Sequence, residues 1–286
     1  MERAQERTKK QPSQPNARAS NSETKNMIQI GANDGKENNN AEVMSILQGP
    51  NNKAVLVEGN PSVFRVLQTN VQSWYDATLQ RIIPLNALVC EDGKRRSFYT
   101  VDVDKIKNAS RTPNLRLPHW VAYQISGLEK RTTHDGLAYY LKLHRDHFKG
   151  NVTASEFIQE ISLECVSFRT IVARAPFDAR EVDVLAVDVE GFDAHVLLAS
   201  FAVPGLEPPL VVFEAKSAAL LFPDKFDEVL DTLHGRGYET NCAARGHRRR
   251  RHAKKLKSKW VCSDEDAWAR KKKQKEEDET RSNSVA

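Results

Sequence analysis

The sequence predicts an α/β protein built around a doubly wound, mostly parallel β-sheet. Short apolar runs bounded by Gly, Asn and Pro alternate with amphipathic stretches along the chain. Several of these runs are apolar at nearly consecutive positions, a pattern typical of strands that are covered by helices on both faces. The alternation of strand and helix indicates parallel strands joined by crossover helices. With 286 residues, 40% of them hydrophobic, the chain can build a substantial core.

Five apolar runs are the strand candidates: 27–33 (MIQIGAN), 54–60 (AVLVEGN), 81–90 (RIIPLNALVC), 182–190 (VDVLAVDVE) and 209–216 (PLVVFEAK). Four segments with helical periodicity follow strand candidates, at 41–48, 62–74, 193–201 and 223–237. The last of them closes on Gly235 and Gly237, a suitable helix end. Two short runs, 238–244 (YETNCAA) and 259–264 (KWVCSD), are expected to form an antiparallel end of the sheet.

Composition divides the chain into three parts. Residues 1–26 are rich in Gln, Ser, Asn, Arg and Lys and are predicted to be a disordered tail. Residues 27–263 form the predicted domain, with an insertion at about 102–162 that interrupts the strand and helix rhythm and is expected to supply substrate contacts or a lid. Residues 264–286 carry alternating blocks of charge with no core face, and are predicted to be a charged tail.

The net charge of +5 is local in origin. Residues 245–259 hold nine Lys or Arg and no acidic residue, which leaves −4 for the remainder of the chain. Such a loop favours phosphate backbones or acidic membranes as partners, although a solvated loop or a nuclear-import signal is an equally good interpretation. No apolar run approaches the roughly 18 residues of a membrane span, and the first 26 residues lack Val, Ile, Leu and Phe. The expected location is therefore cytoplasmic, or nuclear; the oligomeric state is left open.

The four cysteines, Cys90, Cys165, Cys242 and Cys262, show no metal-type spacing and are interpreted as buried free thiols. Two glycosylation sequons begin at Asn108 and Asn151. Without a recognisable secretory signal, these sequons indicate little.

The turn after the first strand candidate, GANDG, has the features of a cofactor-binding turn. In a doubly wound sheet the ligand lies at the carboxyl ends of the strands. Gly31 allows close approach of the backbone to a ligand, and Gly35 can take dihedral angles closed to other residues. Glu58 ends the second strand, where such folds place an acid that accepts hydrogen bonds from both ribose hydroxyls. A dinucleotide site would need glycine at Asn33. The pattern therefore argues against NAD and favours a nucleoside cofactor without a phosphate, above all S-adenosylmethionine.

A second group of polar residues ends the fourth strand candidate. Asp188, Glu190 and Asp193 lie close together in VDVEGFD, and Glu214 ends the fifth strand candidate. Clustered carboxylates need a cation, a hydrogen-bond network or a raised pKa, and such groups serve as acid/base residues or metal ligands. For Asp193, a cap at the start of the following helix is an equally good interpretation.

These motifs together resemble the FkbM-type methyltransferases, S-adenosylmethionine-dependent enzymes with a Rossmann-like class I fold. The residues that carry the resemblance are IQIGANDG, VLVEGNP, NALVCEDG, VDVLAVDVEGFDAHVL and VVFEAK, in that order, over about residues 26–243. The resemblance implies a cofactor site formed by Gly31, Asn33, Asp34, Gly35, Glu58, Asn60, Asn86, Ala87 and Asp188. Where many relatives have an aspartate two residues before the first glycine, this chain has Gln29.

The predicted function is S-adenosylmethionine-dependent O-methylation of a hydroxyl on a small molecule or glycan. Asp188, Glu190 and Asp193, in that order, are the candidate bases. A divalent metal is possible in such chemistry but has no support in the sequence. His119 and His134 of the insertion are weaker candidates, and His195 is interpreted as packed or solvent-exposed. The alternative is a catalytically weak protein of the same fold that binds nucleic acid through residues 245–259.

Overall fold

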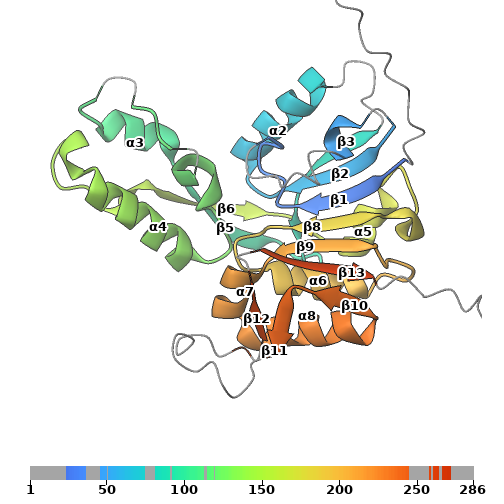
Figure 1. Ribbon diagram of the computed structural model, residues 1–286. Helices are drawn as coiled ribbons and strands as arrows, with labels where there is room; N and C mark the ends of the chain where they lie inside the picture. Colours follow the sequence, from blue (N-terminus) through green and yellow to red (C-terminus); the bar gives the residue numbers. More distant parts are fainter. Residues whose placement is uncertain are drawn as a thin grey trace, which may run out of the picture.

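Seven strands form one sheet in the order β10-β13-β9-β8-β1-β2-β3 (Figure 1). The computed structural model describes residues 24–36, 46–49, 51–74, 81–90, 92–112, 115–118, 120–244, 258, 260–263 and 266–271. Five strands are parallel: β1 (Asn26–Ile30), β2 (Lys53–Glu58), β3 (Ile82–Asn86), β8 (Val184–Val187) and β9 (Leu210–Glu214). The strand β13 (Asp266–Lys271) runs antiparallel to both of its neighbours, β9 and β10 (Tyr238–Thr240). The predicted fold class is confirmed.

Helices cover both faces of the sheet, as the continuous apolar strands require. In β1, Ile28 and Ile30 face the helices α5 (Phe168–Ala173), α6 (Asp193–Phe201) and α8 (Pro223–Gly235), whereas Met27 faces the opposite side. On that opposite side the sheet packs against α2 (Pro61–Trp74) through Leu67 and Val71. The short helix α7 (Ala215–Leu221) follows β9 directly.

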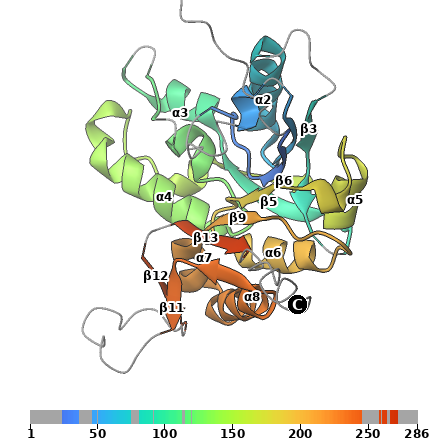
Figure 2. The same ribbon diagram turned by 45° about the vertical axis from the view of Figure 1, so that its right-hand side comes forward.

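The predicted insertion forms a lobe of its own, which we call the insertion lobe (residues 102–157). At its base β5 (Arg96–Val101) pairs antiparallel with β6 (Ile158–Leu163), so the first and last residues of the lobe lie next to each other. It contains α3 (Val103–Ala109), the π-helical turn η1 (Trp120–Gln124), α4 (Lys130–Leu143) and the 3-10 turns η2 (Arg145–His147) and η3 (Ala154–Phe157). Ile106, Leu137 and Phe148 centre a separate core. Figures 1 and 2 both show the lobe standing beside the sheet.

The predicted C-terminal tail is wrong over residues 266–271. They form β13, which lies in the sheet between β10 and β9. Ala267 and Ala269 are fully buried there, whereas Trp268 and Arg270 point outward. The alternation has the period of a strand, but the two buried residues are alanines and three of the other four are charged, so the segment resembles solvated sequence. Residues 1–23 and 272–286, and nearly all of the basic loop 245–259, lie outside the described residues.

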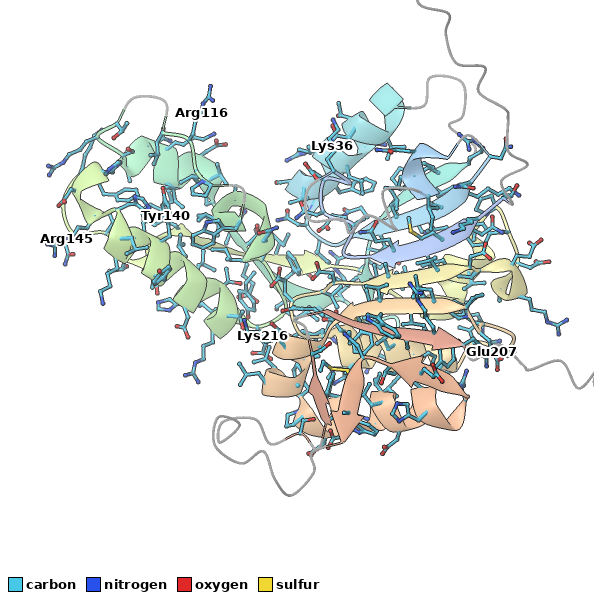
Figure 3. The ribbon with its side chains drawn as sticks, viewed as in Figure 1. Lys36, Arg116, Tyr140, Arg145, Glu207 and Lys216 are labelled. Atoms are coloured by element: carbon cyan, nitrogen blue, oxygen red, sulfur yellow. A yellow bond between two sulfur atoms is a disulfide. The ribbon has the colours of Figure 1, made fainter. Side chains whose placement is uncertain are left out.

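The prediction of free thiols is also wrong, because all four cysteines are paired. Cys90 bonds to Cys165, and Cys242 bonds to Cys262 (Figure 3). Cys165 begins β7 (Cys165–Val166), which pairs with β4 (Leu88–Val89) just before Cys90. Cys242 of β11 (Cys242–Ala244) lies directly opposite Cys262 of β12 (Trp260–Cys262). Spacing along the chain does not show such cross-strand neighbours. No helix among the described residues is both long enough and apolar enough to cross a membrane.

Candidate active site at the carboxyl ends of the strands

A cavity of about 600 Å³ lies at the carboxyl ends of β1, β2, β8 and β9. Its sheet side is formed by the turn after β1, the end of β2, the end of β8 with the segment that follows it, and the end of β9. Its other side is formed by Phe98 of β5 and by residues 124 and 126–128, which join η1 to α4 in the insertion lobe. The volume is in the range of small-molecule sites, and the position is the one expected for a ligand in a doubly wound sheet.

The turn after β1 depends on Gly31, which lines the cavity. Gly31 has a φ of +79°, and a Cβ placed on it would lie 1.7 Å from the carbonyl oxygen of Asp188. The amides of Gly31 and Ala32 both donate to the carbonyl of Val57, at 2.8 and 2.9 Å. Gly31 therefore lets the turn lie against the ends of both β8 and β2. The close approach predicted for this glycine is made to protein backbone.

Asp34 and Gly35 complete that turn and do not line the cavity. Gly35 has a φ of +76° and donates its amide to the carbonyl of Ala32 at 2.9 Å. The carboxylate of Asp34 accepts from the amide of Lys36 at 2.8 Å. Their predicted role in cofactor binding stays a prediction, since both residues shape the turn from behind.

Glu58 ends β2 and faces the cavity. Its Oε2 accepts from the amide of Asn33 at 2.9 Å, and its Oε1 accepts from the amide of Asn60 at 2.7 Å. Asn33 has a φ of +50°, so this carboxylate holds a turn residue in the left-handed region. Burial raises the pKa of Glu58 to about 7, and the nearby Asp188 carboxylate contributes in the same direction.

Asn60 and Asn86 hold the strand ends together and do not line the cavity, whereas Ala87 does. The side-chain amide of Asn60 donates to the hydroxyls of Thr100 and Ser126, at 3.1 and 3.2 Å. This residue is 2% exposed and fastens the insertion lobe to the end of β2. The side-chain amide of Asn86 donates to the carbonyl of Glu58 at 2.7 Å. Both asparagines therefore position residues of the cavity.

The wall formed by β8 and β9 is acidic. Asp188, Glu190 and Glu214 line the cavity together with Glu58. Glu190 has a φ of +55°, and its pKa is raised to about 9, first by burial and then by the surrounding carboxylates, of which Asp188 has the largest effect. No Lys or Arg occurs among the described residues that line the cavity. A ligand with positive charge would relieve the repulsion between these groups.

Asp193 lies behind this wall rather than in it. Its side chain is fully buried and accepts from the amides of Gly191 and Glu214, both at 3.1 Å. These bonds tie the loop after β8 to the end of β9. Burial, followed by the charges of Asp188 and Glu214, raises the pKa of Asp193 well above its ordinary value. Its predicted catalytic role stays a prediction. The predicted helix cap is wrong, because Phe192 is the N-cap residue of α6 and Asp193 instead accepts from the preceding loop and from the end of β9.

Of the candidate histidines, His195 is the one placed at the cavity, on α6. Its ring lies 5.6 Å from that of Phe192 and 4.7 Å from that of Phe222, measured between centroids. His134 is on α4, contacts Asp135 and does not line the cavity. His119 lies outside the described residues.

Trp120 of η1 packs edge to face on Tyr140 with the ring centroids 6.0 Å apart. It belongs to the core of the insertion lobe, where Figure 3 labels Tyr140. Trp120 therefore contributes to the packing of the insertion lobe.

The strand order and the position of the cavity agree with a comparison with known families. A family model described as the methyltransferase FkbM domain matches residues 29–240. The chain belongs to the FkbM methyltransferase family. Its fold is that of the S-adenosylmethionine-dependent methyltransferases. Among the curated proteins, none matches this chain by sequence.

Solved structures with this fold are similar to the chain only at a distance. An FkbM methyltransferase from Methylobacillus flagellatus is 12% identical with a TM-score of 0.42, and the match covers 86% of this chain and 43% of that one. A fibrillarin from Aeropyrum pernix with natively bound S-adenosylmethionine is 14% identical with a TM-score of 0.33, covering 86% and 66%. The O-methyltransferase TomG from Streptomyces achromogenes, in complex with S-adenosylmethionine, is 10% identical with a TM-score of 0.35, covering 86% and 72%. The family assignment therefore rests on the family model.

The cavity of this FkbM-family chain fits the cofactor class of the fold in its charge. S-adenosylmethionine carries a sulfonium and an ammonium group, and four carboxyl groups face the cavity. Among the described residues, no group of three or more His, Cys, Asp or Glu is arranged to hold a metal ion. The insertion was expected to supply contacts at the site, but residues 124 and 126–128 within it could not be singled out. Phe98 of β5 was not predicted, because it reaches the cavity through pairing of β5 with β6, which has no local sequence signal.

Proposed function

We propose that this chain is an S-adenosylmethionine-dependent O-methyltransferase that acts on a hydroxyl of a small molecule or glycan. The observation that carries the proposal is the acidic cavity at the carboxyl ends of the strands, with Glu58, Asp188, Glu190 and Glu214 on its wall and no basic residue among its described lining residues. A phosphate-bearing dinucleotide would meet repulsion there, whereas a cationic cofactor would be attracted.

In this proposal Glu58 accepts the hydroxyls of the cofactor's ribose, and Ala87 lies beside its adenine. Gly31 and Asn33 lie beside the methionine end. Gln29 stands where many relatives have an aspartate, and it lines the same cavity.

When bound, the cofactor supplies an electrophilic methyl group, and the chain's residues align the acceptor, exclude water and remove its proton. Asp188 is our first candidate for the base. Glu190 is second, because a pKa of about 9 keeps it protonated at neutral pH until a cation enters the cavity. Asp193 positions the loop that carries Glu190, and His195 is an additional polar group at the cavity wall. Acceptor contacts come from Phe192 and the insertion lobe.

Titration calorimetry with S-adenosylmethionine and, separately, NAD tests the cofactor. We expect binding of the first and none of the second. Glu58→Ala should abolish measurable binding, because it removes the ribose acceptor and frees the amides of Asn33 and Asn60. Glu239→Ala, an exposed glutamate of β10, is the matched control and should bind as the wild type does. Unchanged affinity in Glu58→Ala would refute the ribose placement.

Methyl-labelled cofactor incubated with fractionated extract tests the reaction and finds the acceptor. We expect Asp188→Asn to retain more cofactor affinity than turnover, because the amide keeps the shape of the side chain but cannot take a proton. Label that enters an amine or a carbon centre would contradict O-methylation. The nucleic-acid alternative depends on residues 245–259, of which the structure describes only Ser258, and no structural observation favours it.

A further inference from the structure

The two disulfides bear on where this chain folds. Each closes a pair of neighbouring strands: Cys90 with Cys165 beside the β4–β7 pair, and Cys242 with Cys262 across the β11–β12 pair. Structural disulfides persist in oxidising compartments and are rare in the cytosol, where thiols are kept reduced. Pairing of all four cysteines is therefore an argument against the cytosolic location expected from the sequence.

The glycosylation sequons are an independent observation that points the same way. The chain has two Asn-x-Ser/Thr sequences in which x is not proline, at Asn108 and Asn151, and both lie in the insertion lobe. Asn108 is exposed on the last turn of α3, and Asn151 is exposed in the loop after η2. Asn60 also precedes a serine by two positions, but Pro61 excludes it as an acceptor and its side chain is buried.

The two acceptor asparagines lie on segments that are bonded to each other. The amide of Lys149 donates to the carbonyl of Ala109 at 3.0 Å, and Ser110 forms an antiparallel bridge with Phe148. Figure 3 places Arg145, which begins η2, at the end of the lobe away from the sheet. The lobe contributes to the cavity through residues 124 and 126–128, which form a different segment. Groups attached at both asparagines would therefore gather on one edge and leave the cavity open.

We propose that this chain folds in an oxidising, glycosylating lumen and carries N-linked glycans on Asn108 and Asn151. In each modification the side-chain amide nitrogen forms a bond to C1 of a lipid-pyrophosphate-linked oligosaccharide. The C1–oxygen bond to the pyrophosphate breaks, and one amide proton leaves with the lipid pyrophosphate. In each oxidation two thiols become one disulfide, and two electrons and two protons pass to the disulfide of a thiol oxidoreductase. The proposal is independent of the methyl acceptor.

The chain isolated from its native source tests both parts. After deglycosylation by an amidase in ¹⁸O-water, a glycosylated asparagine is recovered as labelled aspartate in peptide mass spectrometry. We expect label at Asn108 and Asn151 and none at Asn60. Alkylation of the denatured chain without reductant should modify no cysteine, and after reduction it should modify all four. Unlabelled asparagine at both sequons, or alkylation of all four cysteines before reduction, would overturn the proposal.

Variants assign each glycan to its asparagine. The full chain is expressed behind a cleavable secretory signal in a eukaryotic cell, and its electrophoretic mobility is compared before and after glycan removal. Asn108→Gln and Asn151→Gln should each lose one glycan-sized step, and the double variant should lose both. Asn51→Gln changes an exposed asparagine outside any sequon and should lose none. A secreted, folded wild type that does not shift on glycan removal would contradict the assignment.

Discussion

At the scale of single residues, the candidate site depends on Gly31 more than on any charged group. The turn after β1 passes so close to β8 that the amide of Asp188 donates to Ile30 at 2.9 Å, and the Asp188 carbonyl fills the space of a Cβ on Gly31. The same turn donates two amides to the end of β2. One residue without a side chain thus joins three strands at the cavity.

Gly31→Ala should lower the free energy of unfolding by about 3 kcal/mol, because a positive φ and an overlap with backbone add together. Gly237→Ala is the matched control. Gly237 has nearly the same φ, +81°, but a Cβ on it would meet no atom within 4 Å, so only the backbone cost of about 1 to 2 kcal/mol applies. Urea unfolding at one pH measures both. Equal losses in the two variants would show that the turn relaxes away from β8.

At the scale of elements, the sequence predicts what local periodicity encodes. The helix predicted at 193–201 is α6 with those same bounds. The strand candidates contain β3, β8 and β9, and all but the first residue of β1 and β2. These elements carry long apolar runs. β13 was missed, because its place between β9 and β10 comes from pairing with residues far away in the chain. Disulfide pairing was missed for the same reason.

Some residues of the candidate site could likewise be predicted from the local sequence, and others could not. Gly31, Glu58 and Asp188 could be predicted to lie together because each follows a strand, and parallel strands end at one edge of a sheet. Phe98 could not be predicted, because it reaches the cavity through the β5–β6 pair. Asn60 was expected at the cofactor, whereas its side chain fastens the insertion lobe, a role that depends on Ser126 arriving from another part of the chain.

The two disulfides should differ in what they contribute to stability. A cross-link restricts the unfolded chain more when it closes a longer loop. Cys90 and Cys165 are 75 residues apart and Cys242 and Cys262 only 20, which corresponds to about 4.5 and about 3 kcal/mol respectively on the chain-entropy model. The double variant Cys90→Ser/Cys165→Ser should therefore lose more stability than Cys242→Ser/Cys262→Ser. Chemical unfolding without reductant measures it, and a larger loss in the second variant would contradict the loop-length account.

At the scale of the whole molecule, the carboxyl groups at and behind the cavity wall destabilise the folded protein when they ionise. Glu58, Glu190 and Asp193 all have raised pKa values, and burial is the largest cause for each. The folded chain therefore holds protons that the unfolded chain releases. S-adenosylmethionine has a sulfonium, an ammonium and one carboxylate, so its net charge is positive. It would lower these pKa values, and its binding should therefore release protons and strengthen as the pH rises.

We expect the free energy of unfolding of the cofactor-free protein to fall as the pH rises from about 5 to 9. A carboxyl group whose pKa is higher in the folded state than in the unfolded state binds more protons when folded, so stability decreases with pH between the two values. The window runs from 4.5 to about 7 for Glu58, with a slope of about 1.4 kcal/mol per pH unit. Glu190 should extend the fall to about pH 9 with a smaller slope, because the residue is exposed to solvent and its interactions are screened. Glu190→Gln, which cannot ionise, should flatten the fall above pH 7, whereas the exposed Glu239→Gln should leave it unchanged. Urea unfolding at one-unit pH steps, with the disulfides intact, measures the slopes. Parallel curves for wild type and Glu190→Gln would mean that Glu190 ionises in the folded chain as readily as in the unfolded chain. Saturating S-adenosylmethionine should raise the free energy of unfolding most at the alkaline end of the range.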